Sequence, residues 1–118
     1  MNFDRIDIHS AFVPIGYVAL ASTNSLDNEE NFLAACLRLD EDFLPCARRS
    51  NIEAGEISET IRLIVRDLQG ASKFIDVILE IEDVVSATVL GDDPNSAGKA
   101  FLIRCKKKMF YINWFRAS

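Results

Sequence analysis

The stretch that best indicates the fold is VVSATVLGDDPNSAGKAFLIRCKKKMFYINWF, residues 84–115 of the 118-residue chain. It contains three runs rich in apolar, β-branched and aromatic residues, at 84–90, 100–105 and 109–115. A segment of glycine, aspartate, proline and asparagine separates the first two runs, and three lysines separate the last two. Runs bounded in this way are typical of β-strands joined by turns. We therefore predict a C-terminal β-meander.

Two amphipathic helices are predicted upstream of the meander. The first has an acidic first turn, which suits the helix dipole, followed by apolar residues at helical spacing: Glu29, Glu30, Phe32, Leu33, Cys36 and Leu37. Asp40 and the residues after it are expected to end this helix. The second helix follows Gly55, and its apolar stripe consists of Ile57, Ile61, Ile64, Val65 and Leu68.

The N-terminal part is expected to add strands to the same sheet. Phe3, Ile6 and Ile8 partly alternate with polar residues, which indicates a first strand at an edge of the sheet. A proline and a glycine interrupt the next apolar run, and we interpret residues 17–21 as the second strand. Residues 74–85 fit either a strand or a helix face, and their β-branched content favours a strand.

These elements predict an α+β fold in which residues 1–118 form a single domain. Two helices pack on an antiparallel sheet that ends in the β-meander. The composition agrees with a folded chain, because 49% of the residues are hydrophobic and the net charge is −5. No run approaches the ~18 apolar residues of a membrane span, so a membrane is not an expected partner.

The first residues and the cysteines favour a cytoplasmic location. Residues 1–5, MNFDR, contain an acid and lack the basic and apolar regions of a signal peptide. Cys36, Cys46 and Cys105 are odd in number and widely spaced, unlike the disulfide framework of a small secreted protein. We expect reduced thiols, with Cys36 and Cys105 in the core.

Few residues offer catalytic chemistry, so we predict that the chain is not an enzyme and uses no cofactor or metal. The only histidine, His9, lies close to Asp7 and Ser10, but Ser10 points to the other side of a strand and does not complete a triad. Cys46 lies beside two arginines, whose charge lowers a thiol pKa, and a reactive thiol is the alternative. Zinc-type cysteine spacing and a glycine-rich phosphate loop are both absent from the sequence.

The most distinctive feature of the chain is its division of charge. All 18 acids and seven of the 13 bases lie in residues 1–96, a balance of −11, whereas residues 97–118 hold the other six bases and no acid. The acids gather in short clusters without calcium-loop spacing, which we interpret as solvated surface open to protein contacts. Loops carry contacts more often than regular elements, so the predicted partner-binding residues are Asp40, Glu41, Asp42, Asp92 and Asp93.

The basic C-terminal part has two interpretations. Lys106–Lys108 with Phe110, Tyr111 and Trp114 form a mixture that neutralises phosphates and stacks bases. An isoelectric point near 4.8 argues against a nucleic-acid partner. Alternatively, the lysines pair with the acidic body of the chain itself, and the aromatic residues form the core face of a strand.

The expected function is that of a small acidic module that sequesters or inhibits a basic protein partner, as immunity proteins, antitoxins and phage inhibitors do. One alternative is a small-ligand site between the helices and the sheet, or, less favoured, an enzyme that uses carboxylates or Cys46. Another is a structural subunit or homodimer that pairs through residues 109–115 as an exposed edge strand.

Overall fold

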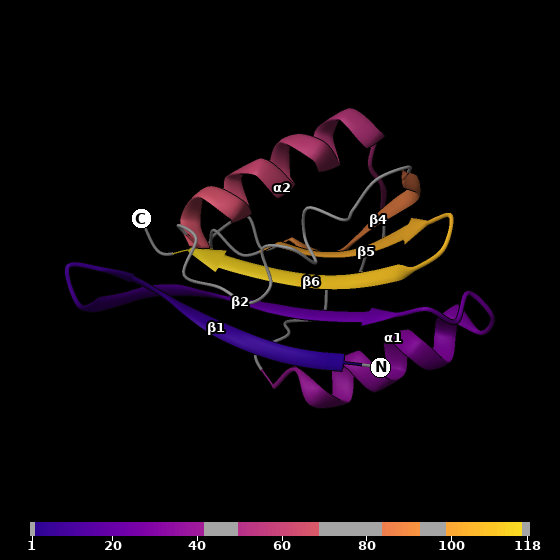
Figure 1. Ribbon diagram of the computed structural model, residues 1–118, viewed down its shortest axis with the longest axis horizontal. Helices are drawn as coiled ribbons and strands as arrows, with labels where there is room; N and C mark the ends of the chain where they lie inside the picture. Colours follow the sequence, from indigo (N-terminus) through magenta and orange to yellow (C-terminus); the bar gives the residue numbers. More distant parts are fainter. Residues whose placement is uncertain (1, 42–49, 69–83, 93–98, 117–118) are drawn as a thin grey trace.

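A computed structural model describes residues 2–41, 50–68, 84–92 and 99–116 of the chain. These residues form a six-stranded sheet and two helices (Figure 1). In chain order the elements are β1 (Asn2–Ser10), β2 (Val13–Thr23), α1 (Glu29–Leu39), β3 (Ser50–Asn51), α2 (Ala54–Leu68), β4 (Val84–Asp92), β5 (Lys99–Cys105) and β6 (Met109–Arg116). The sheet order is β1-β2-β6-β5-β4-β3, and every neighbouring pair is antiparallel.

The predicted α+β fold class is confirmed. Strands β4, β5 and β6 lie side by side as the C-terminal meander, and β1 forms one edge of the sheet. The two-residue strand β3, which pairs with Thr88 and Val89 of β4, was not predicted because two residues carry no periodic pattern. Most of the segment 74–85 lies outside the described residues, and only Val84 and Val85 are seen, at the start of β4.

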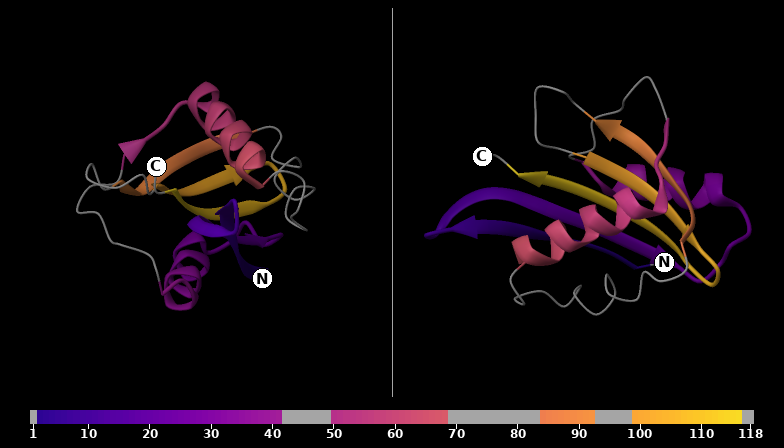
Figure 2. Two further views of the ribbon diagram at one scale, coloured as in Figure 1. Left: turned by 90° about the vertical axis from the view of Figure 1, so that its left-hand side faces the viewer. Right: turned by 90° about the horizontal axis from the view of Figure 1, so that it is seen from above.

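The two helices cover opposite faces of the sheet (Figure 2). On one face α1 buries Phe32, Leu33 and Cys36 against the sheet. On the other face α2 buries Ile57, Ile61 and Ile64 of its predicted stripe. The sheet therefore separates two core layers, and one helix covers each of them. No helix in the described ranges is both long and apolar enough to cross a membrane.

Strand β6 lies in the middle of the sheet, between β2 and β5. Successive residues of a strand point to opposite faces, so Phe110 and Ile112 pack under α2 while Met109 and Tyr111 pack under α1. A strand buried on both faces has a continuous apolar sequence rather than an alternating one. The hypothesis that residues 109–115 form an exposed edge for self-assembly is therefore wrong.

Strand β2 is longer than predicted, because it continues through Pro14 and Gly16. Pro14 faces His9 at an irregularity in the β1–β2 pairing, where a missing N–H donor is tolerated. Gly16 lies where β6 comes close, and a Cβ atom there would overlap the carbonyl oxygen of Phe115. Both residues that resemble strand breakers are thus explained by their positions in the sheet.

A two-residue turn, Ala11–Phe12, joins β1 to β2. The flanking residues Ser10 and Val13 pair with each other, and both turn residues have positive φ, 49° and 72°. This is the backbone of a type I′ hairpin turn, which usually contains glycine or asparagine. The hairpin extends past the end of β6 (Figure 1).

Candidate functional site

The loop acid Asp40 is buried, contrary to the expectation that it lies on the surface. It directly follows α1, and its side chain is 4% exposed. Its Oδ2 accepts hydrogen bonds from the Tyr111 hydroxyl at 2.5 Å and from Nδ2 of Asn113 at 2.9 Å. Asp40 is therefore occupied inside the fold and is not a surface contact for a partner.

Burial around Asp40 keeps three neighbouring groups protonated. Burial, together with the nearby Asp40 carboxylate, raises the pKa of the Cys36 thiol to about 12. The same causes raise the pKa values of Tyr111, which also donates its hydrogen bond to Asp40, and of Tyr17. Near neutral pH the cluster thus contains a protonated thiol and two phenols, and Cys36 is not a nucleophile there.

Because of these pKa values, we expect the protein to lose stability at alkaline pH. The unfolded chain releases the Cys36 proton near its ordinary pKa of 9.0, whereas the folded chain keeps it until about pH 12. The unfolded state is therefore increasingly favoured as pH rises above 9, and the tyrosines add to the effect above their ordinary value of 10.0. Urea unfolding from about pH 7 to about pH 11 measures this decrease.

The matched variant for this measurement is Cys36→Ala. It is expected to show a smaller fall in unfolding free energy above pH 9, because one of the groups with a raised pKa is removed. Equal slopes for Cys36→Ala and the unaltered chain would show that this thiol titrates as it does in the unfolded chain.

A second acid, Asp67, forms a similar contact on the opposite face. It is 8% exposed, accepts a hydrogen bond from Nε1 of Trp114 at 3.0 Å and forms an ion pair with Arg116. Asp67 lies in the last turn of α2, and Asp40 follows the last turn of α1, positions where the helix dipole disfavours an acid. Donors from β6 satisfy both carboxylates, so this strand ties the C-terminal ends of both helices to the sheet.

The other predicted contact acids have different positions. Glu41 is exposed directly after Asp40. Asp92 ends β4 opposite Lys99, while Asp42 and Asp93 lie outside the described residues. A partner-binding role for these four acids stays a prediction.

The remaining sequence candidates do not meet in one place. His9 is exposed near the end of β1, while Cys36 and Cys105 are buried, as predicted. Cys46 lies outside the described residues. Within the described ranges, no group of three or more His, Cys, Asp or Glu side chains is arranged to hold a metal ion.

The lysine turn and its aromatic neighbours do not form a base-stacking surface. Lys106–Lys108 lie between β5 and β6, but Phe110 and Tyr111 are fully buried on opposite faces of the sheet. Trp114 is half-buried and its indole N–H is bonded to Asp67. The interpretation of these aromatic residues as the core of a strand is thus confirmed.

A pocket of about 410 Å³ lies between α2 and the β3–β5 side of the sheet. Its apolar lining comes from Ile52, Val89 and Phe101, and its polar lining comes from Asn51, Glu56, Glu59, Thr60 and Lys99. Three separate parts of the chain therefore contribute: the segment from β3 into α2, the β4 strand and the start of β5. The lining is thus about equally polar and apolar, and binding pockets combine apolar side chains with polar groups that fix the orientation of what they bind.

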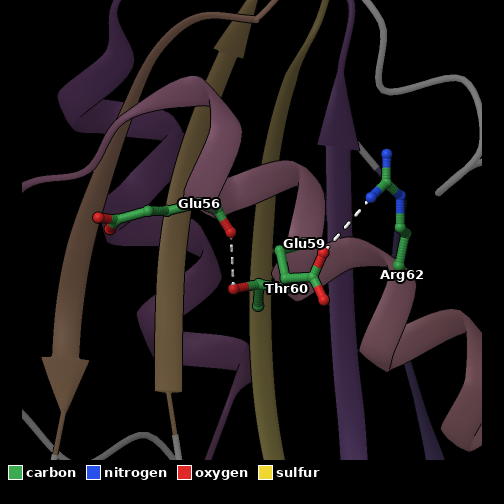
Figure 3. A network of polar contacts seen from close by, with 4 residues as sticks. All are labelled: Glu56, Glu59, Thr60 and Arg62. Atoms are coloured by element: carbon green, nitrogen blue, oxygen red, sulfur yellow. Dashed lines mark hydrogen bonds and ion pairs between the residues drawn. The ribbon is translucent and has the colours of Figure 1, made fainter.

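The two carboxylates of the pocket have different surroundings (Figure 3). Glu59 forms an exposed ion pair with Arg62 at 3.3 Å. The Glu56 side chain extends away from this pair, while its backbone carbonyl accepts a hydrogen bond from the Thr60 hydroxyl at 3.1 Å. Exposed ion pairs contribute roughly 0–1 kcal/mol, so Glu59 exchanges Arg62 for another cation at little cost.

The sequence alone did not point to this pocket. Glu56 and Glu59 fit the polar face of an amphipathic helix, which is the ordinary position for such residues. The pattern that marks α2 as a helix carries no information on which strands lie beside that face. Comparison with protein-family models, curated proteins and solved structures gives no match for this chain.

Proposed function

We propose that this chain is a protein-binding module that sequesters or inhibits a partner with a basic surface. The observation that carries the proposal is the pocket beside α2, whose lining combines Glu56 and Glu59 with apolar side chains. The chain itself would be of the type of immunity proteins, antitoxins and phage inhibitors, a cytoplasmic protein that binds its partner and is not an enzyme.

The pocket suits a long basic side chain of the partner. Lysine and arginine combine an apolar stem with a cationic head, and the stem would pack on Ile52, Val89 and Phe101 while the head approaches one of the two glutamates. Lys99 at the rim leaves the charged lining with a single excess negative charge, which favours one cationic side chain over a dense basic cluster. The net charge of −5 adds long-range attraction that speeds the encounter.

A pull-down with matched charge variants tests the proposal. The tagged full chain, its E56Q/E59Q variant and its E29Q/E30Q variant are incubated with lysate of the source cells at about 0.1 M and about 0.5 M NaCl. Both variants change the net charge from −5 to −3, and both alter the N-terminal part of a helix, but only the first alters the pocket. We expect one stoichiometric basic protein with the unaltered chain and with E29Q/E30Q, weakened at the higher salt.

The E56Q/E59Q variant is expected to retain little of this protein. Equal recovery with both variants would show that the pocket acids are not the contact, and an empty pull-down for all three chains would contradict the proposed function.

Small-ligand binding in the same pocket is the alternative that its size favours. Recovery of no protein, together with a bound cationic small molecule in mass spectra of the purified chain, would support that alternative.

A further inference from the structure

The tip of the β1–β2 hairpin presents an aromatic ring that the described part of the fold leaves in solvent. Phe12 is 99% exposed and its neighbour Val13 is 59% exposed. The tip sequence, Ala11-Phe12-Val13-Pro14, contains no charged residue. The hairpin carries this group beyond the body of the sheet (Figure 1), which places the ring on a narrow, convex projection.

The backbone at the same position is strained. Ala11 and Phe12 both adopt positive φ, a backbone region that residues other than glycine, asparagine and aspartate rarely occupy. A glycine at position 12 would remove the strain at that position and the exposed ring together. Backbone strain of this kind concentrates at binding and switching sites, and exposed apolar groups mark interaction surfaces. Two independent features thus point to the same residue.

We propose that the hairpin tip inserts Phe12 into an apolar pocket on the surface of a protein partner. A two-residue tip is convex, so its complement is a concave site, and aromatic side chains, phenylalanine included, are enriched at protein interfaces. The hairpin is held at its base by pairing of β2 with β6 up to Gly16. The ring is therefore presented on a rigid support, which reduces the ordering cost of binding.

The charges around the hairpin favour a protein over a membrane. Insertion of an apolar tip into a lipid surface is normally assisted by free cationic side chains that attract anionic headgroups. Here Arg5 is paired with Asp7, and Arg116 is paired with the buried Asp67. Each of these two cations thus has an acid beside it, and the net charge of −5 repels anionic lipid.

This inference extends the proposed function, because it supplies an apolar contact in addition to the acidic pocket. The two contacts differ in how they respond to salt. Burial of a phenyl ring is insensitive to moderate ionic strength, whereas the contact of Glu56 and Glu59 with a cation weakens as salt screens it. Each contact is consequently recognisable by its own readout.

The test begins with p-benzoylphenylalanine placed at position 12 or at Val85, an apolar residue of β4 that is 62% exposed. Photocrosslinking in lysate of the source cells identifies what lies against each position. The probe is then the purified crosslinked protein, and its dissociation constant is measured for the unaltered chain, F12A, F12G and V85A at about 0.1 M and about 0.5 M NaCl. Thermal melting of each variant confirms that it is folded.

We expect crosslinking at position 12 and not at position 85. F12A and F12G are expected to bind about 30-fold more weakly at both salt concentrations, and V85A to bind within about twofold of the unaltered chain. F12G relieves the strain at position 12 and F12A does not, so equal losses of affinity in the two variants would assign the effect to the ring. Affinity for F12A within about twofold of the unaltered chain would overturn the inference even if the acidic pocket proved essential.

Three other results would also overturn it. Co-sedimentation with vesicles of phosphatidylcholine, with or without phosphatidylglycerol, that is lost in F12A would assign the tip to a membrane. A crosslink from position 12 to a second copy of this chain would assign it to self-assembly. Equal crosslinking at positions 12 and 85 would show that crosslinking follows solvent exposure and not a specific contact of Phe12. If instead only the E56Q/E59Q variant lost its salt-dependent binding, the proposed function would stand without the hairpin contact.

Discussion

Replacing Asp40 by alanine is expected to lower the free energy of unfolding by about 3 kcal/mol. The substitution removes the acceptor of the Tyr111 hydroxyl and of the Asn113 amide, both of which are buried. Each donor then loses this acceptor at a buried position, and that loss costs more than the net gain from an ordinary hydrogen bond. Urea unfolding followed by circular dichroism measures the difference.

Two further variants separate this effect from a general loss of charge. Glu41→Ala removes an exposed acid from the adjacent position and is expected to change stability by less than about 0.5 kcal/mol. Asp40→Asn keeps one side-chain acceptor oxygen and is expected to fall between the two. If D40A and E41A behaved alike, Asp40 would be a solvated loop residue and the buried contact to β6 would be refuted.

Gly16→Ala is the second substitution with a large expected effect, a loss of about 3 kcal/mol. The new Cβ would overlap the carbonyl oxygen of Phe115 and lie 2.9 Å from Cα of Arg116. Backbone atoms of a central strand have little freedom to move, so β2 and β6 would have to separate locally. The expected result is a lower melting temperature and weaker protection of amides in the β2–β6 pairing from hydrogen exchange.

Gly55→Ala provides the matched control, because nothing lies within 4 Å of the position that its new Cβ would occupy. Gly55 belongs to α2, where alanine is favoured over glycine by about 0.5–1 kcal/mol, so this variant should be more stable than the unaltered chain. The same glycine-to-alanine change is thus expected to lower stability at position 16 and to raise it at position 55. A G16A variant as stable as G55A would mean that β2 and β6 do not approach each other closely at Gly16.

The parts of the fold that the sequence predicted are those set by local periodicity. The apolar stripe of α2 and the three runs of residues 84–115 each determine their own secondary structure, because burial of one face follows directly from the spacing of apolar residues. The boundaries of β2 were harder to predict from the sequence. Pro14 and Gly16 resemble breakers until the pairing with β1 and the approach of β6 are known.

The candidate sites depended on contacts between distant residues, and here the sequence was a poor guide. Asp40 belongs to a run of three acids, a pattern typical of surface residues. It is nevertheless buried, and it accepts hydrogen bonds from donors that lie 71 and 73 positions away in the sequence. The pocket beside α2 joins three parts of the chain, none of which is unusual by itself. The turn at Ala11–Phe12 lacks the glycine or asparagine that would have marked it.

Binding of a basic partner in the acidic pocket is tested most sharply by the dissociation constant of the captured protein as a function of salt. Titrations from about 0.05 M to about 0.5 M NaCl compare the unaltered chain with E56Q/E59Q and E29Q/E30Q. Affinity is expected to fall steeply with salt for the unaltered chain and for E29Q/E30Q, whereas E56Q/E59Q is expected to bind weakly with a shallower salt dependence. Identical affinity and salt dependence for the unaltered chain and E56Q/E59Q would contradict it.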